Sequence, residues 1–298
     1  LMYPGQYALT NPDRPAFILA GSGLAVSYAD FEARSNKLAH FLRSQDLQFQ
    51  DHYAIFMENN ERYMESCAAG ERAGLYYTCI NSYLTGDELA YIVNNSESKV
   101  LITSKSKIEV VVEALASCPN IQMVLVTDGD DLELPQDMMD FASAVEVCSP
   151  ASLAQEHLGT SMLYSSGTTG QPKGIIRPLP EQPPAEPLPL FQFLGALWGY
   201  REDMIYLSPA PLYHSAPQAA VNLTLRIGGT VVIMEHFDPL EYLHLIERYQ
   251  VTHTQLVPTM FSRMLKLSDD ERTSANLSSL EIAVHAAAPC PVMVKQQM

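Results

Sequence analysis

The stretch Met162-Leu-Tyr-Ser-Ser-Gly-Thr-Thr-Gly-Gln-Pro-Lys-Gly174 decides which fold and which chemistry we expect of this chain. It holds four hydroxyl side chains and three glycines around Lys173, and the apolar pair Ile175-Ile176 follows it. Glycines allow positive φ and close backbone approach to a ligand, while hydroxyls, backbone N–H groups and an ammonium suit phosphate oxygens. The pattern predicts a strand, a loop and a second strand, with the loop binding a polyphosphate.

This stretch has two other possible interpretations. The common nucleotide-binding P-loop requires Gly-Lys followed by Ser or Thr, whereas Pro172 and Gly174 flank the lysine here, which excludes it. A flexible Ser/Thr/Gly surface turn is the structural alternative, because such clusters usually mark loops. The Pro-Lys-Gly ending and the apolar residues on both sides favour the phosphate site.

Composition predicts a soluble cytoplasmic enzyme. The chain has 298 residues, 47% of them hydrophobic, which is enough for one large domain or two ordinary ones. It has no run of eighteen apolar residues, and its first residues lack the basic-then-apolar pattern of a signal peptide. We therefore expect no transmembrane segment.

The net charge argues against two classes of partner, and the cysteine spacing argues against disulfides and zinc. The net charge of −16 disfavours nucleic acid and anionic membranes, which need clustered Lys and Arg. The five cysteines are scattered and never in Cys-x-x-Cys spacing, so we expect buried thiols rather than disulfides or a zinc site. The acidic run from Asp128 to Glu133 is interpreted as a solvated turn, and no metal is placed there.

Strand and helix patterns alternate along the whole chain. The signals include a Ser27 cap before a periodic stretch, the capping box Thr85-Gly-Asp-Glu88, and Pro258 opening a helix. Strands alternating with helices predict an α/β fold of layered, mainly parallel sheets flanked by helices, with ligands at the carboxyl ends of strands. The proline-rich segment from Arg177 to Pro189 should be extended, crossing the surface or serving as a polyproline ligand.

A second chemical cluster is Pro209-Ala-Pro-Leu-Tyr-His-Ser-Ala-Pro217, which places Tyr213 and His214 after an apolar run. A lone histidine is more often a hydrogen-bonded structural residue than a functional one. The nearby apolar stretches 219–225 and 257–265 are candidate walls for an acyl chain, although such stripes are usually core.

The phosphate loop and the histidine cluster together resemble the adenylate-forming superfamily of acyl-CoA synthetases, adenylation domains and luciferases. The resemblance implies that the loop and Lys173 wrap the β- and γ-phosphates of ATP. It implies a catalytic role for Lys173 and His214, and an acyl site bordered by Tyr213 and His214. The turn after the strand 280–284 is similar to the adenine-contacting turn, although relatives commonly have glycines at Ala286 and Ala287. The implied nucleotide contacts are Ser165, Ser166, Gly167, Thr168, Thr169, Gly170, Lys173, Ala287, Ala288 and Pro289.

The resemblance covers the whole chain but only part of the family's large domain. No Tyr-Gly-x-Thr-Glu segment follows, and no C-terminal domain with its catalytic lysine. We expect an incomplete large N-terminal domain over residues 1–298, with two α/β subdomains that meet near residues 150–205 and no C-terminal domain.

The resemblance implies ATP-dependent activation of a carboxylic acid, with Mg²⁺ and coenzyme A. Tyr213-His214-Ser215 lacks the aspartate that holds an amino group, so a simple acid, and a fatty acid first, is expected. We expect the 298-residue chain alone to be inactive. The alternative is a non-catalytic nucleotide- or acyl-binding module that keeps the fold.

Overall fold

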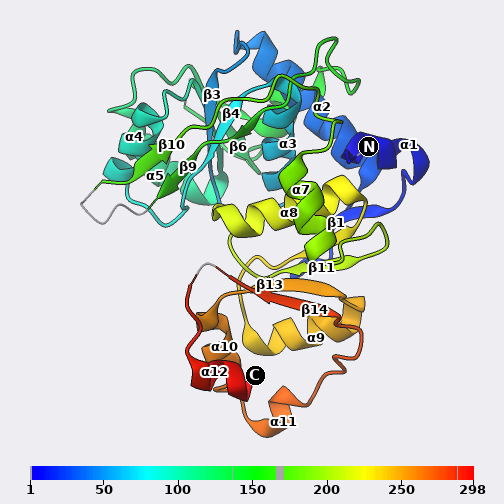
Figure 1. The fold of residues 1–298 in the computed structure, drawn as a ribbon. Helices are drawn as coiled ribbons and strands as arrows, with labels where there is room; N and C mark the ends of the chain where they lie inside the picture. Colours follow the sequence, from blue (N-terminus) through cyan, green and yellow to red (C-terminus); the bar gives the residue numbers. More distant parts are fainter. Residues whose placement is uncertain (1, 136, 166–170, 287) are drawn as a thin grey trace. The chain divides into compact units, whose positions relative to one another are not determined.

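The computed structural model describes residues 2–135, 137–165, 171–286 and 288–298. The chain divides into two compact units, which are considered separately: unit 1 takes in Leu1–Asp30 and Pro187–Met298, and unit 2 takes in Phe31–Glu186. The described strands form one six-stranded sheet in each unit, and a two-stranded hairpin in unit 2 (Figure 1).

Unit 1 is built on a sheet with the strand order β14-β13-β11-β12-β1-β2. Every neighbouring pair is parallel except β1 with β2, a hairpin at the sheet edge. The strands are β1 (Pro15–Leu19), β2 (Ala25–Ser27), β11 (Ile205–Ser208), β12 (Thr230–Ile233), β13 (His253–Leu256) and β14 (Ile282–His285). The helices are α1 (Pro4–Thr10), α7 (Pro189–Leu197), α8 (Ser215–Ile227), α9 (Pro239–Tyr249), α10 (Pro258–Met264), α11 (Asp269–Arg272) and α12 (Val292–Gln297).

Helices cover both faces of the unit 1 sheet, with α8 on one side and α9 with α10 on the other (Figure 1). Leu207 and Val232 pack with Ile246 and Phe261 into one apolar cluster on the α9 side. Local signals set the helix starts: Asp238 accepts from the N–H of Leu240 and of Glu241, and Pro258 occupies the first turn of α10 as expected. Each β-α unit thus buries its apolar stripe against the sheet.

Unit 2 is built on a wholly parallel sheet with the order β7-β6-β5-β3-β4-β8. Its strands are β3 (His52–Phe56), β4 (Tyr76–Cys79), β5 (Val100–Ser104), β6 (Met123–Thr127), β7 (Met138–Asp140) and β8 (Thr160–Ser161), and β9 (Leu163–Ser165) with β10 (Lys173–Ile175) forms the hairpin. Its helices are α2 (Tyr28–Ser44), whose first turn belongs to unit 1, α3 (Tyr63–Ala73), α4 (Gly86–Asn95), the 3₁₀ turn η1 (Lys105–Lys107), α5 (Ile108–Leu115) and α6 (Phe141–Glu146).

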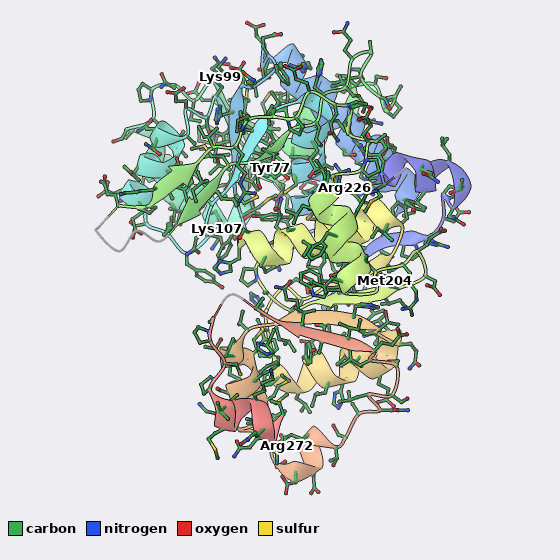
Figure 2. All side chains as sticks on the ribbon, in the orientation of Figure 1. Tyr77, Lys99, Lys107, Met204, Arg226 and Arg272 are labelled. Carbon is green, nitrogen blue, oxygen red and sulfur yellow. The ribbon has the colours of Figure 1, made fainter. Side chains whose placement is uncertain are left out.

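Successive residues of β3 and β5 are buried. Since successive strand residues point to opposite faces, both faces of the unit 2 sheet are covered. Ala54 and Phe56 pack with apolar side chains of α4 and α5. Tyr53 and Tyr77 point to the other face, where their hydroxyls donate to Ser66 and Glu71 of α3. Tyr77 in unit 2 and Arg226 on α8 in unit 1, both labelled in Figure 2, are among the largest fully buried side chains. Each unit therefore has a core of its own.

Several local expectations are confirmed. The Glu88 carboxylate accepts a hydrogen bond from the Thr85 N–H at 2.9 Å, closing the capping box of α4. Ser27 accepts from the Asp30 N–H at 3.1 Å near the start of α2. The proline-rich segment contains no helix or strand from Arg177 to Leu188, whereas its last residue, Pro189, begins α7.

The expectation of buried cysteines is only partly right. None of the five cysteines forms a disulfide, but only Cys67 and Cys118 are buried, while Cys79, Cys148 and Cys290 are partly exposed. Each of these three stands at or just outside the end of a helix or strand. Within the described residues, no helix is both long enough and apolar enough to cross a membrane.

Candidate functional site

Ser165 and Lys173 form the register pair that closes the β9–β10 hairpin on its loop side. The sequence predicted this strand-loop-strand arrangement, and the two strands are antiparallel, with Tyr164 opposite Gly174. The hairpin follows β8 directly, so it leaves the sheet of unit 2 at its carboxyl edge, where ligand sites of parallel sheets usually lie. Of the expected phosphate contacts, Ser166, Gly167, Thr168, Thr169 and Gly170 lie outside the described residues.

Two tyrosines anchor the base of this hairpin to α4. The Tyr164 hydroxyl donates to Asn95 Oδ1 at 2.6 Å, and the Tyr91 hydroxyl donates to the Pro172 carbonyl at 3.0 Å. Burial, with Tyr91 as a second cause, raises the pKa of Tyr164 to about 12, so the phenol keeps its donor proton at neutral pH. The strands on either side of the loop are therefore fixed to a helix of the same unit.

Gly174 packs closely against the ends of two side chains. A Cβ at this position would lie 2.4 Å from Met162 Cε and 3.1 Å from Tyr164 Cζ. The neighbouring Lys173 is exposed, and no described acidic side chain is within ion-pair distance of it. Its ammonium is free to meet a phosphate group.

Tyr213 and His214 lie in unit 1, on the turn that connects β11 to α8. His214 is the N-cap residue of α8, and its ring centroid is 4.5 Å from that of Tyr213. Part of His214 is exposed, yet burial of the rest lowers the pKa of its imidazole below the usual value. At neutral pH the ring is therefore mainly uncharged, and it can donate one hydrogen bond and accept another.

The expected adenine turn follows β14 in the same unit. Because β11, β13 and β14 are parallel neighbours, their carboxyl ends share one sheet edge, which carries both this turn and the Tyr213–His214 turn. Ala288 and Pro289 are exposed there, and Ala287 lies outside the described residues. The fold thus brings the histidine turn and the adenine turn to one edge of unit 1.

Two polar residues at this edge were not assigned from the motifs. Ser208 ends β11 with its hydroxyl buried, and His285 ends β14 with a buried Nδ1; neither atom has a hydrogen-bond partner among the described residues. The His285 ring lies edge-on to Phe261, with centroids 6.0 Å apart. Their place in the sequence could have identified both residues, since each is the last residue of a strand in a parallel sheet.

Where side chains are described, no group of three or more His, Cys, Asp or Glu residues could hold a metal ion.

Comparisons with known proteins agree with this architecture. The family model described as "AMP-binding enzyme" matches residues 6–298. The chain is 26% identical to 4-coumarate-CoA ligase 1 of Petroselinum crispum over 281 residues, 93% of this chain and 50% of that protein. It is also 26% identical over 308 residues to the medium/long-chain-fatty-acid-CoA/3-oxocholest-4-en-26-oate-CoA ligase of Mycolicibacterium smegmatis, covering 96% of this chain and 55% of that protein. The chain spans about half the length of these relatives.

The fold itself matches a solved structure. The N-terminal domain of FACL13 from Mycobacterium tuberculosis superposes with a TM-score of 0.82 at 21% identity, covering 98% of this chain and 71% of that one. The expected α/β fold with parallel sheets flanked by helices is confirmed, and so is the resemblance to adenylate-forming enzymes. With a family model that spans nearly the whole sequence, the chain belongs to the AMP-binding enzyme family.

Proposed function

We propose that this chain is part of an AMP-forming acid-CoA ligase. The observation that carries the proposal is the hairpin at the carboxyl edge of unit 2: Ser165 and Lys173 bracket a loop of glycines and hydroxyls, in a chain of the AMP-binding enzyme family. Stabilising the charge of a leaving phosphate group is the main contribution that a protein makes to such displacements. The relatives named as CoA ligases support the same class of reaction.

The proposed reaction has two steps. In the first, a carboxylate oxygen attacks the α-phosphorus of ATP, the bond from that phosphorus to its bridging oxygen breaks, and pyrophosphate leaves. In the second, the thiol of coenzyme A loses its proton and attacks the acyl carbonyl, and AMP leaves. Lys173 and the loop donors neutralise charge on the departing pyrophosphate, and Mg²⁺ enters bound to ATP.

His214 is proposed to orient the acid. Its ring is mainly uncharged at neutral pH, so an N–H can donate to the substrate carboxylate without forming a tight ion pair that would have to be broken before attack. Tyr213 borders the same site, and the turn at Ala287, Ala288 and Pro289 is proposed to contact adenine. Both turns belong to unit 1.

A fatty acid is the proposed substrate. No acidic side chain stands within Tyr213-His214-Ser215 to select an ammonium group, and α8 and α10 supply apolar residues in the same unit. One relative is named for medium- and long-chain fatty acids, and another for 4-coumarate. Five cysteines without a disulfide fit the reducing cytoplasm, where we place the enzyme.

The two α/β units are proposed to form only part of the enzyme's large domain. Because the chain spans about half of its relatives, we propose that the 298 residues alone bind ATP weakly and form no thioester. Thioester formation by the purified 298-residue chain would refute this proposal.

The deciding experiment measures pyrophosphate release by the longest form of the protein that contains this chain. Fatty acids of six to eighteen carbons are compared with 4-coumarate and with amino acids. Release that depends on a fatty acid, and that is abolished by Lys173→Ala together with His214→Ala, supports the proposal. Release with 4-coumarate and with no fatty acid would support the proposed reaction but contradict the proposed substrate. Binding of ATP without release for any acid would instead indicate a non-catalytic module.

A further inference from the structure

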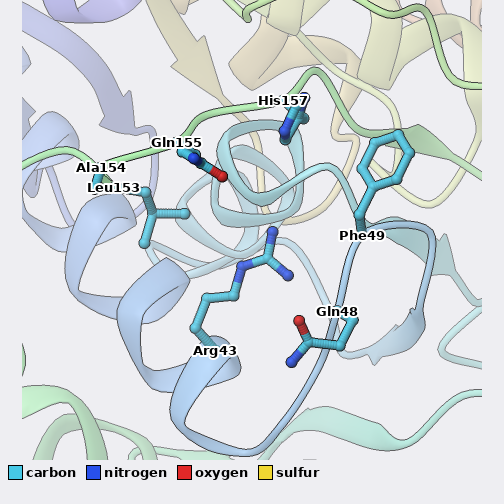
Figure 3. A pocket seen from close by; sticks show the side chains of 7 residues that line it. All are labelled: Arg43, Gln48, Phe49, Leu153, Ala154, Gln155 and His157. Carbon is cyan, nitrogen blue, oxygen red and sulfur yellow. The ribbon is translucent and has the colours of Figure 1, made fainter.

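A cavity of about 360 Å³ lies within unit 2, between the last turns of α2, the connection from α2 to β3, and the segment that leads into β8. Figure 3 shows the guanidinium of Arg43 in the middle of the residues that line it. The lining consists of Arg43, Gln48, Phe49, Leu153, Ala154, Gln155 and His157. It contains one guanidinium, two amides, a ring pair and no carboxylate.

Arg43 is held by two hydrogen bonds and has no ionic partner among the described residues. It donates from Nη1 to the Leu47 carbonyl and from Nη2 to the Ala73 carbonyl, each at 2.6 Å. A guanidinium has five N–H groups, so these two bonds leave three for a ligand. No described carboxylate is within ion-pair distance, and burial lowers the pKa of Arg43. An anion in the cavity would pair directly with a guanidinium that no described carboxylate contacts.

The acidic residue that acts on Arg43 electrostatically is already engaged. Asp51 accepts from Lys99 Nζ at 2.7 Å and from the Gln48 N–H at 2.7 Å. These contacts fix the connection between α2 and β3 without filling the cavity. The charge of Arg43 is thus available to a bound molecule.

The ring wall is formed by two exposed rings that contact each other. The rings of Phe49 and His157 lie 5.0 Å apart at their centroids, and the Gln50 N–H donates to the Gly74 carbonyl at 2.8 Å. Gly74 has a φ of 63°, and a Cβ there would come within 2.6 Å of the Phe49 ring and 2.8 Å of His157 Cβ. Glycine at this position lets the chain turn and keeps both rings in place.

The side chains that line the cavity favour a carboxylate over a phosphate. A phosphate dianion is usually met by several cations or a row of backbone N–H groups, whereas this cavity offers a single planar guanidinium, which suits a carboxylate. Leu153 and the two rings supply an apolar wall for the rest of the molecule. The volume lies at the small end of the roughly 300–1,000 Å³ range of ligand pockets, which suits a one-ring acid better than a nucleotide.

We propose that this cavity binds a small aromatic carboxylate, with its carboxylate on Arg43 and its ring against Leu153 and the Phe49–His157 pair. The proposal does not depend on the ligase function, because every lining residue belongs to unit 2 and His214 belongs to unit 1. It concerns a binding site and requires no turnover.

The test is calorimetric titration of the purified protein with 3-phenylpropanoate, with 3-phenylpropanamide as the neutral counterpart and phenyl phosphate as the phosphate source. Gln155→Glu is the main variant, because Gln155 is exposed and the new carboxylate would occupy Arg43 from within the cavity. Gln122→Glu adds the same charge at an exposed position outside the lining. His214→Ala reports binding at the proposed acyl site.

The expected result is saturable binding of the carboxylate and none of the amide. Affinity should fall about tenfold or more in Gln155→Glu, since a charged hydrogen-bond partner is lost, and stay unchanged in Gln122→Glu and His214→Ala. Arg43→Met should lose affinity equally, but it also strands two carbonyl groups, so Gln155→Glu decides. Binding that survives Gln155→Glu, that is lost only in His214→Ala, or that prefers phenyl phosphate would overturn the proposal, as would no saturable binding.

Discussion

Ser165 and Lys173 face each other across the last register pair of the β9–β10 ladder, so the loop between them begins and ends at one point of the molecule. A loop with clamped ends loses less conformational entropy when it closes on a ligand than a loop with free ends. The clamp continues into α4 through Tyr164 and Tyr91. The proposed phosphate site thus rests on a short, fixed base.

Replacing Lys173 by alanine should weaken ATP binding and pyrophosphate release by about tenfold to a hundredfold, because a charged donor to phosphate is removed. ATP affinity is measured by fluorescence titration, and release is measured in the longest form of the protein. Lys105→Ala is the control, since this exposed lysine is paired with Asp131 at 2.7 Å. Equal effects of the two variants would show that Lys173 acts only through general charge.

Tyr164→Phe should lower the free energy of unfolding by about 0.5–1.5 kcal/mol, because the hydrogen bond from the partly buried Tyr164 to Oδ1 of the exposed Asn95 is lost. ATP affinity should fall as well, since the loop base loosens. Urea denaturation and nucleotide titration measure the two effects. Tyr83→Phe, at a residue 73% exposed, should change neither quantity.

Gly159 and Gly195 should respond oppositely to alanine. A Cβ at Gly159 would lie 2.2 Å from the Gly70 carbonyl oxygen and 2.4 Å from that of Leu75, both backbone atoms, so Gly159→Ala should cost about 3 kcal/mol or more. A Cβ at Gly195, inside α7, would meet Ile227 Cδ1 at an ordinary 3.4 Å, so Gly195→Ala should stabilise by about 0.5–1 kcal/mol. Thermal and urea unfolding test both, and a tolerated Gly159→Ala would contradict the packing before β8.

Acid should destabilise unit 1 partly through His253. Its Nε2 lies 3.1 Å from the Trp198 carbonyl and its Nδ1 lies 2.8 Å from Thr252 Oγ1, and burial lowers its pKa. The unfolded chain therefore binds a proton at a higher pH than the folded one does. It follows that the free energy of unfolding falls as pH drops from 7 to 5, by at most about 1.4 kcal/mol per pH unit for one group.

His253→Gln should flatten this pH dependence without abolishing it, because burial also lowers the pKa of His52 and of His214. The exposed His236 supplies the control variant, His236→Gln, which should leave the slope unchanged. Urea denaturation at half-unit steps of pH measures the slope. If the His253→Gln variant has a slope as steep as that of the parent protein, His253 does not contribute to the pH dependence of stability.

Much of the fold and part of the site could be predicted from the sequence, because the deciding interactions are local. The capping box at Thr85, the helix start at Pro258 and the strands beside the Lys173 loop each depend on residues a few positions apart. The predicted place of His214, after a strand and before a helix, is likewise local. Helical periodicity and helix caps depend on residues within a few turns of one another, so the local sequence is enough to predict them.

Only the tertiary structure decided which distant segments meet. Phe17 pairs with Val231 in parallel strands, so unit 1 combines the first 30 residues with the segment from Pro187 onward. No local periodicity in the sequence predicts that pairing. The arrangement of Ser208 and His285 on one sheet edge, and of Arg43 beside Gln155, also follows from burial and strand order. The sequence by itself determined the elements and the phosphate-loop chemistry. The packing of apolar faces, which is non-directional and acts between segments far apart in the chain, determined their neighbours.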